Sequence, residues 1–155
     1  MNLLAWNCQG LGIALTVRNL RDECSRKKPH LVFLMETKQK ASVVRKVRRR
    51  CGFTEEWIVN PVGKSGGLAL WWSDVITINI LFSSSNIIHT SVVSATLSTP
   101  TYIPFFWGPS DDVERELCWQ EVRRISSNIR DSWMCIGDFN DILSQQEESG
   151  GRPKA

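Results

Sequence analysis

The distribution of apolar and polar residues divides the start of the chain into a strand, a helix and a second strand. Leu3–Trp6 and Leu31–Met35 are continuous apolar runs, which are typical of strands that are covered on both faces. Between them, Ile13, Val17, Leu20 and Cys24 recur at helical spacing. This order predicts a layered fold in which helices pack against a sheet.

The middle of the chain changes from helical spacing to short strands. A second helix is predicted around an apolar stripe of Val43, Val44, Val47 and Cys51. Five strands separated by turns are then predicted at Phe53–Val59, Gly67–Trp72, Val75–Phe82, Ile87–Ser94 and Tyr102–Trp107. Because the turns between them are short, we expect consecutive strands to form antiparallel pairs.

A long amphipathic helix and one more strand are predicted after Pro109. The apolar residues expected on the inner face of the helix are Val113, Leu117, Val122, Ile125 and Ile129. The run Trp133–Ile136 predicts a buried strand, which leads into Gly137–Asn140. The tail from Gln145 to Ala155 is polar and adds no further element. We therefore expect residues 1–155 to form a single domain that is incomplete at its C-terminus.

Composition narrows the class of protein without identifying its chemistry. With 155 residues, of which 42% are hydrophobic and 23% charged, the chain is the size of one globular domain and is neither disordered nor collagen-like. Its net charge of +3 fits an anionic partner, but many other proteins share it. No apolar run approaches the length of a membrane helix. No CxxC pair or Cys/His cluster supports zinc or a disulfide framework among Cys8, Cys24, Cys51, Cys118 and Cys135.

Polar side chains recur where the predicted buried strands end. Asn7 and Glu36 directly follow the first two strands, and Asp138 and Asn140 closely follow the last. The carboxyl ends of strands in layered folds form a shared rim where ligands bind. Carboxylate and amide oxygens there suit Mg²⁺ or Mn²⁺ and suit zinc poorly. Each residue taken alone also fits an ordinary turn, so only the set favours a metal site.

Four short motifs give the chain a family resemblance. They are Trp6–Gly10, Leu34–Lys38, Gly66–Trp72 and Gly137–Asn140, and they occur in the order found in the endonuclease/exonuclease/phosphatase superfamily. This class includes exonuclease III, the abasic-site endonucleases and deoxyribonuclease I. In particular, the chain resembles the endonuclease domain of plant LINE-type (non-LTR) retrotransposons, in which a stretch similar to Glu147–Pro153 commonly follows the last motif.

The resemblance implies a fold, a reaction and a role for each polar residue. The fold would be α+β, a four-layer α/β/β/α sandwich of two mixed sheets that lacks its last strands. The reaction would be Mg²⁺-dependent (or Mn²⁺-dependent) phosphodiester hydrolysis, with nicking of DNA as the expected activity. By the same resemblance, Glu36 holds the metal, Asn7 orients the metal centre, Asp138 positions or deprotonates the attacking water, and Asn140 contacts the scissile phosphate.

Two departures from the family pattern lower the expected rate. The family has Tyr-x-Pro where this chain has Trp107-Gly108-Pro109, and an indole N–H can donate a hydrogen bond but cannot ionise as a phenol can. Family members also end with an Asp-His pair, whereas the chain's His30 and His89 both precede Asp138 and are expected to be structural. We therefore expect slow nicking or none.

Further basic residues are candidates for binding the substrate. Lys38 would lie on the same face as the preceding glutamate if its strand continued, and could contact a phosphate or pair with a carboxylate. Arg45, Arg48 and Arg49 lie on the second predicted helix and could follow a DNA backbone. That helix could equally be a nuclear-localisation patch or a solvated face.

Several alternatives to a DNA endonuclease stay open. The same motifs occur in phosphatases of inositol lipids and in RNA deadenylases, whose specificity lies in loops. The chain could also be a nucleic-acid-binding module without catalysis, or a degenerate element fragment without activity. We expect an intracellular protein, nuclear if it acts within a retroelement. No membrane association is expected, and no protein partner can be inferred.

Overall fold

The computed structural model describes residues 1–141 and residue 149. In chain order, the elements of this part are β1 (Leu3–Asn7), α1 (Ala14–Lys27), β2 (Leu31–Met35), α2 (Ala41–Arg50), β3 (Glu55–Val59), β4 (Leu68–Trp72), β5 (Ile76–Ser83), β6 (Ile87–Ser94), β7 (Thr101–Trp107), α3 (Asp112–Ser127) and β8 (Ile136–Asp138).

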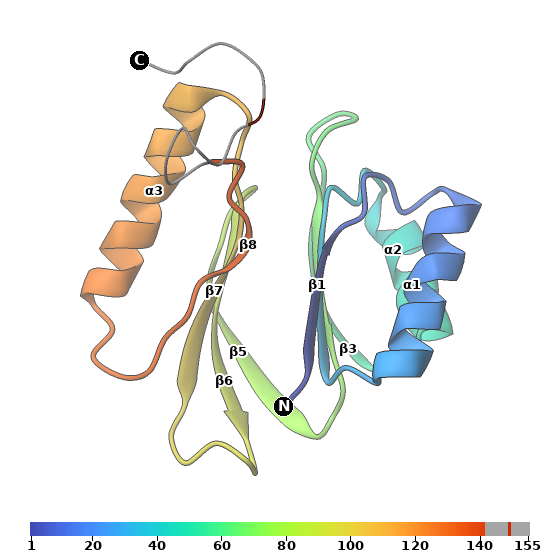
Figure 1. Ribbon diagram of the computed structural model, residues 1–155, viewed down its shortest axis with the longest axis horizontal. Helices are drawn as coiled ribbons and strands as arrows, with labels where there is room; N and C mark the ends of the chain where they lie inside the picture. Colours follow the sequence, from blue (N-terminus) through green and yellow to red (C-terminus); the bar gives the residue numbers. More distant parts are fainter. Residues whose placement is uncertain (142–148, 150–155) are drawn as a thin grey trace.

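The strands form two sheets that pack face to face between helical layers. One sheet has the order β1-β2-β4-β3 and the other the order β5-β6-β7-β8. Both are mixed, because β1 is parallel to β2 and β8 is parallel to β7, while the other pairs are antiparallel. Helices α1 and α2 cover the outside of the first sheet, and α3 lies outside the second (Figure 1). The expected α+β fold, a four-layer sandwich of two mixed sheets, is confirmed.

Strand β2 shows why continuous apolar runs mark the centre of this sandwich. All five of its residues are buried. Phe33 faces the second sheet, where its ring centroid lies 5.0 Å from that of Phe105. Val32 and Leu34 point to the opposite face and pack under the helices. Because side chains alternate between the faces of a strand, only a strand covered on both sides needs apolar residues throughout.

The predicted pairing of consecutive strands is correct except at one point. The pairs β3–β4, β5–β6 and β6–β7 are antiparallel, but β4 and β5 lie in different sheets. Strand β4 is buried throughout and lies between β2 and β3, whereas β5 alternates between buried and exposed positions. The short turn at Ser73–Val75 therefore carries the chain from one sheet to the other.

The predicted inner face of α3 is wrong in its first half. Val113 and Leu117 are 71% and 60% exposed, while Val122 and Ile125 are buried as expected. The buried stripe begins instead at Arg115, which is 6% exposed. A stripe through Arg115 has the same helical spacing as the predicted one, so the error came from assigning the inner face by hydrophobicity alone.

The predicted last strand begins too early. Trp133 and Met134 are 43% and 50% exposed, and Trp133 forms only an isolated bridge with Tyr102. Strand β8 starts at Ile136, where the chain pairs with the end of β7 from Phe105 onward. Apolar residues before the strand thus lie on the surface, and the paired segment continues into the polar motif.

Three other expectations concern the chain as a whole. All five cysteines are free thiols, as expected. Among the described residues, no helix is both long and apolar enough to cross a membrane. The polar tail from Gln145 to Ala155, with the stretch Glu147–Pro153, lies outside the described residues apart from Ser149.

Candidate active site

The polar residues predicted at strand ends meet at one end of the sandwich, at the top of Figure 1. Asn7 ends β1 and is in register with Met35 of the parallel strand β2, so Glu36 follows at the same edge. Asp138 ends β8 in the other sheet. The Asn7 Nδ2 donates a hydrogen bond to the Asp138 Oδ2 over 3.0 Å. Side chains from the two sheets therefore meet directly.

Asp138 and Asn7 hold each other in a defined orientation. The Asp138 Oδ1 accepts the backbone N–H of Asn140 over 3.0 Å, so both carboxylate oxygens are engaged. Because the Asn7 Nδ2 points to the Asp138 carboxylate, the Asn7 Oδ1 faces away from it. This oxygen is buried and has no hydrogen-bond partner among the described residues. A buried acceptor without a partner is rare and points to a ligand that supplies positive charge or a donor.

The backbone at this edge adopts unusual conformations. Gln9, Glu36, Lys38 and Asn140 have positive φ angles of 48°, 54°, 53° and 49°. Non-glycine residues seldom occupy this left-handed region, and such residues cluster at functional sites where the surrounding structure holds them. Four of them at one edge are a structural signal that no spacing in the sequence could reveal.

Two neighbouring loops hold the segment that carries Glu36. The Gly10 N–H donates to the Glu36 carbonyl over 2.9 Å, and the Lys38 N–H donates to the Gly66 carbonyl over 2.9 Å. Thr37 between them is fully buried. A Cβ at Gly67, whose φ is +89°, would lie 2.4 Å from the Thr37 Oγ1. The first three sequence motifs thus act together to fix one glutamate.

The Gly-Asp-Phe-Asn motif is fixed through its glycine and its phenylalanine. A Cβ at Gly137 would lie 1.7 Å from the Phe106 carbonyl oxygen, so only glycine lets β8 approach β7 this closely. The Phe139 ring stacks on Phe106 and Trp119 with centroid distances of 5.4 and 5.3 Å. This anchors the motif in the outer layer and fixes the backbone that carries its polar residues.

Arg115 is a further residue of this region that the sequence did not single out. Its Nη1 donates to both carbonyl oxygens of Pro109–Ser110, over 3.1 and 3.0 Å. Its Nε lies 3.5 Å from the Asp141 Oδ2, which also accepts the Trp119 Nε1–H over 3.1 Å. The buried guanidinium therefore ties the start of α3 to the residue directly after the Gly-Asp-Phe-Asn motif. Its position on a helical stripe was the only signal for it in the sequence.

Lys38 and Trp107 border the polar residues. Strand β2 ends at Met35, so it does not continue to Lys38. The Lys38 Nζ nevertheless lies 3.8 Å from the Glu36 Oε1. Trp107 lines a cavity of about 690 Å³ together with Glu36 and Asn140.

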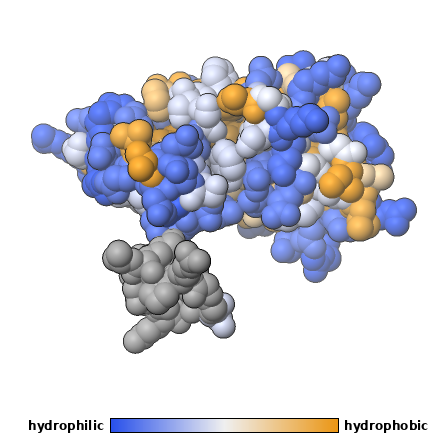
Figure 2. All heavy atoms as spheres, turned by 90° about the horizontal axis from the view of Figure 1, so that it is seen from above, coloured by the Kyte–Doolittle hydropathy of each residue, from blue (hydrophilic) through white to orange (hydrophobic). Residues whose placement is uncertain are grey.

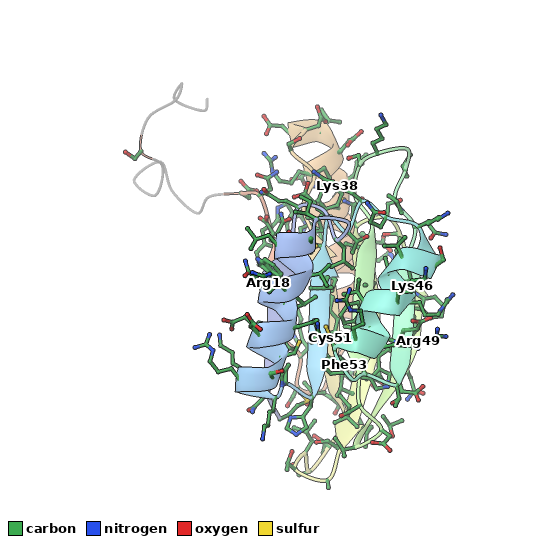
Figure 3. All side chains as sticks on the ribbon, turned by 90° about the vertical axis from the view of Figure 1, so that its right-hand side faces the viewer. Arg18, Lys38, Lys46, Arg49, Cys51 and Phe53 are labelled. Carbon is green, nitrogen blue, oxygen red and sulfur yellow. The ribbon has the colours of Figure 1, made fainter. Side chains whose placement is uncertain are left out.

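Two of the three arginines considered for contact with a DNA backbone, Arg45 and Arg48, form ion pairs within the domain. The Arg45 Nε donates to the Glu56 Oε1 over 2.6 Å, and the Arg48 Nη1 lies 2.8 Å from the Glu56 Oε2. Both side chains of α2 thus pair with a glutamate of β3, in the sheet that α2 covers. Arg49 and Lys46 are exposed on α2, which forms part of the outer helical layer (Figure 3).

Both histidines lie away from the polar residues. His30 precedes β2, at the opposite end from Glu36, and its Nδ1 accepts the Asn2 N–H over 3.0 Å. His89 lies in β6 and lines a separate cavity of about 530 Å³ between the sheet and α3. Burial, and next the nearby Arg124, lower the pKa of the His89 imidazole.

The oxygen donors at this edge fit a hard divalent cation. The Glu36 carboxylate could bind the ion together with the Asn7 Oδ1, which has no partner among the described residues, and the Asp138 carboxylate lies beside Asn7. Among the described residues, no three or more His, Cys, Asp or Glu side chains gather into a cage. Mg²⁺ does not need such a cage, because it retains several waters and uses one or two carboxylates plus substrate phosphates.

Solved structures of low sequence identity share this fold. Truncated Caenorhabditis elegans TDP2 has a TM-score of 0.62 and 15% identity, over 96% of this chain and 65% of that one. D. rerio TDP2 complexed with single-strand DNA product has a TM-score of 0.69 and 18% identity, over 92% and 61%. The endonuclease domain of TRAS1, a telomere-specific non-LTR retrotransposon, has a TM-score of 0.67 and 13% identity, over 92% and 61%.

The chain spans less than two thirds of the length of each of these three structures. None of the curated protein sequences compared with it matches. A family model does match, over residues 4–147, which include the whole set of polar residues described above. The chain belongs to the Endonuclease/Exonuclease/phosphatase family.

Proposed function

We propose that this domain carries out metal-dependent hydrolysis of phosphodiesters and that its reaction is the nicking of DNA. The observation that carries the proposal is the hydrogen bond from Asn7 to Asp138. It joins the ends of two sheets and brings a fixed carboxylate next to an amide oxygen that has no partner among the described residues. Such a pair supplies both a metal ligand and a base or water-positioning group at one place.

Each polar residue has a role that its contacts support. Glu36 and the Asn7 Oδ1 would hold Mg²⁺ or Mn²⁺. When bound, the ion would polarise the phosphate and stabilise the charge that develops on it. Asp138, held by its two hydrogen bonds, accepts a proton from a water or aligns it for attack. Asn140 lines the cavity with Glu36, and its amide can donate to a phosphate oxygen.

DNA is proposed as the substrate on the basis of the comparisons and the charge. One similar structure contains a single-strand DNA product, and another is a retrotransposon endonuclease domain. The net charge of +3 is compatible with a polyanion. Lys46, Arg49 and Arg50 are exposed on α2 and could contact a backbone outside the site, whereas Arg45 and Arg48 pair with Glu56.

The proposed reaction is slow for the chain as it stands. His30 and His89 lie away from Asp138, so neither can supply acid–base catalysis at the phosphate. Trp107 lines the cavity, and its indole cannot ionise as the phenol of a tyrosine can. Loss of one acid–base partner typically costs ~10²–10⁴-fold in rate.

The test is a supercoiled-plasmid nicking assay with Mg²⁺ or Mn²⁺, at high protein concentration and with long incubation. The wild type should nick slowly and only with metal, and Glu36→Gln and Asp138→Asn should each abolish the nicking. Glu55→Gln is the matched control, because Glu55 is an exposed carboxylate on β3. A parallel Mn²⁺ titration, followed by tryptophan fluorescence, should show weaker binding to the Glu36→Gln protein.

Two results would contradict the proposal. Nicking that persists in both site variants would come from a contaminant or from another part of the protein. Absence of metal-dependent nicking by the wild type, at concentrations where Mn²⁺ binding is saturated, would leave a metal-binding domain without this activity.

A further inference from the structure

The cavity beside Glu36 and Asn140 has apolar as well as polar walls. Its volume is about 690 Å³, and Trp107 lines it. One wall is the segment between β3 and β4, which contributes Val62, and the other is the start of α3, which contributes Leu117. These two side chains are 73% and 60% exposed. Figure 2 views the molecule from this end and shows apolar side chains among hydrophilic ones on the α3 side.

Trp107 is held rigidly where it meets the cavity. The backbone N–H of Trp107 donates to the Asn86 backbone carbonyl over 2.8 Å, and the Trp107 backbone carbonyl accepts the Asn86 Nδ2–H over 2.8 Å. The indole also lies against bare backbone, because a Cβ at Gly66 would be 3.2 Å from the Trp107 Cζ3. An indole that packs against this backbone and against the core between the sheets has less freedom to lose when a planar group stacks on it.

The charges around the cavity exclude a run of phosphates. Among the described residues that line it there are two acidic side chains, Glu36 and Glu114, and no lysine or arginine. Lys38 pairs with Glu36 but lines a neighbouring hollow. A DNA backbone needs cationic side chains along its path. A neutral aromatic group, in contrast, gains from an indole and from aliphatic neighbours.

We propose that this cavity binds one unpaired nucleobase of the substrate, stacked on Trp107 and flanked by Leu117 and Val62. The inference rests on the proposed function, because it takes the phosphate next to this base to be the one held at Glu36 and Asn140. The Glu114 carboxylate can accept a hydrogen bond from an exocyclic amino group, as on cytosine. A base buried in this cavity is not paired in a duplex, so the domain selects single-stranded or distorted DNA.

The test measures binding of two short oligonucleotides by the whole chain, with Ca²⁺ in place of Mg²⁺ so that cleavage does not interfere. One probe is oligo-dC, and the other has the same number of phosphates on abasic tetrahydrofuran sugars. Stacking on an aromatic side chain should make oligo-dC bind roughly 5- to 150-fold more tightly. The preference should disappear in Trp107→Ala and largely persist in Trp107→Phe, which retains a ring.

Trp57→Ala is the matched control, because Trp57 is 40% exposed on β3, outside the cavity. The inference is overturned if both probes bind equally to the wild type, if neither binds, or if Trp57→Ala loses the preference as Trp107→Ala does. Loss of the preference in the Trp107→Phe protein as well as in Trp107→Ala would also overturn it. The plasmid assay separates the two proposals. Metal-dependent nicking without a base preference refutes only this inference. A base preference without nicking refutes only the proposed function.

Discussion

Replacing Arg115 with methionine should destabilise the domain far more than any other single change to a charged residue of α3. The side chain is 7% exposed, and its Nη1 makes two hydrogen bonds to the carbonyls of Pro109–Ser110. Methionine would leave those carbonyls without the Arg115 donor and would remove the ion pair with Asp141. Leaving a buried carbonyl without its donor costs about 1–3 kcal/mol, and the ion pair with Asp141 adds less because that side chain is 35% exposed. The pair with Asp112 adds little, because Asp112 is 77% exposed.

The measurement is urea unfolding followed by tryptophan fluorescence, with thermal unfolding beside it. For a domain of this size the predicted loss corresponds to a Tm lowered by about 2–12 °C. Arg123→Met is the control, since Arg123 pairs with Glu116 and the two side chains are 60% and 56% exposed. That change should cost less than about 1 kcal/mol. The reasoning is refuted if Arg115→Met costs no more than Arg123→Met.

Two further predictions concern backbone contact and pH. Gly137→Ala should be strongly destabilising in urea unfolding, because its Cβ would meet the Phe106 carbonyl at 1.7 Å. Gly52→Ala, with φ +87° and no atom within 4 Å, should cost only about 1 kcal/mol of conformational strain. Equal losses in the two variants would contradict the role of close approach. Burial lowers the pKa of the His89 imidazole in the folded state, so the unfolded chain binds more protons and stability should fall as pH drops through and below the ordinary histidine pKa of 6.5. His89→Gln should flatten this acid-side dependence in urea unfolding series, and an unchanged slope in this variant would contradict the prediction.

Much of the fold could be predicted from the sequence because burial on both faces of a strand leaves a direct record. The run Leu31–Met35 matches β2 at both ends for this reason. The assignment of strands to sheets could not be predicted in the same way. A short turn at Ser73–Val75 looks like a hairpin, yet it connects two sheets, because what decides the partner of β4 is packing with distant strands.

The site was predictable in its residue types and less so in its contacts. Polar residues at the ends of predicted apolar strands placed Asn7, Glu36 and Asp138 at an edge. That the Asn7 amide would bond the Asp138 carboxylate required the relative position of two sheets, which no spacing encodes. Arg115 was missed because a buried arginine is the exception on a helical stripe, and its partners lie in two separate loops.

The glycines of the motifs show that the resemblance to the family depends on geometry as much as on chemistry. Gly67 has to lack a side chain because Thr37 fills the space beside it, and Gly137 because β8 touches the backbone of β7. Neither glycine has a side chain that could bind a metal or move a proton. The close packing that these glycines allow fixes the positions of Glu36 and Asp138. A carboxylate displaced by even 1 Å loses much of its catalytic effect. A motif that combines a glycine with an acid therefore specifies the position of the acid, which explains why the four motifs together were informative when single acids were not.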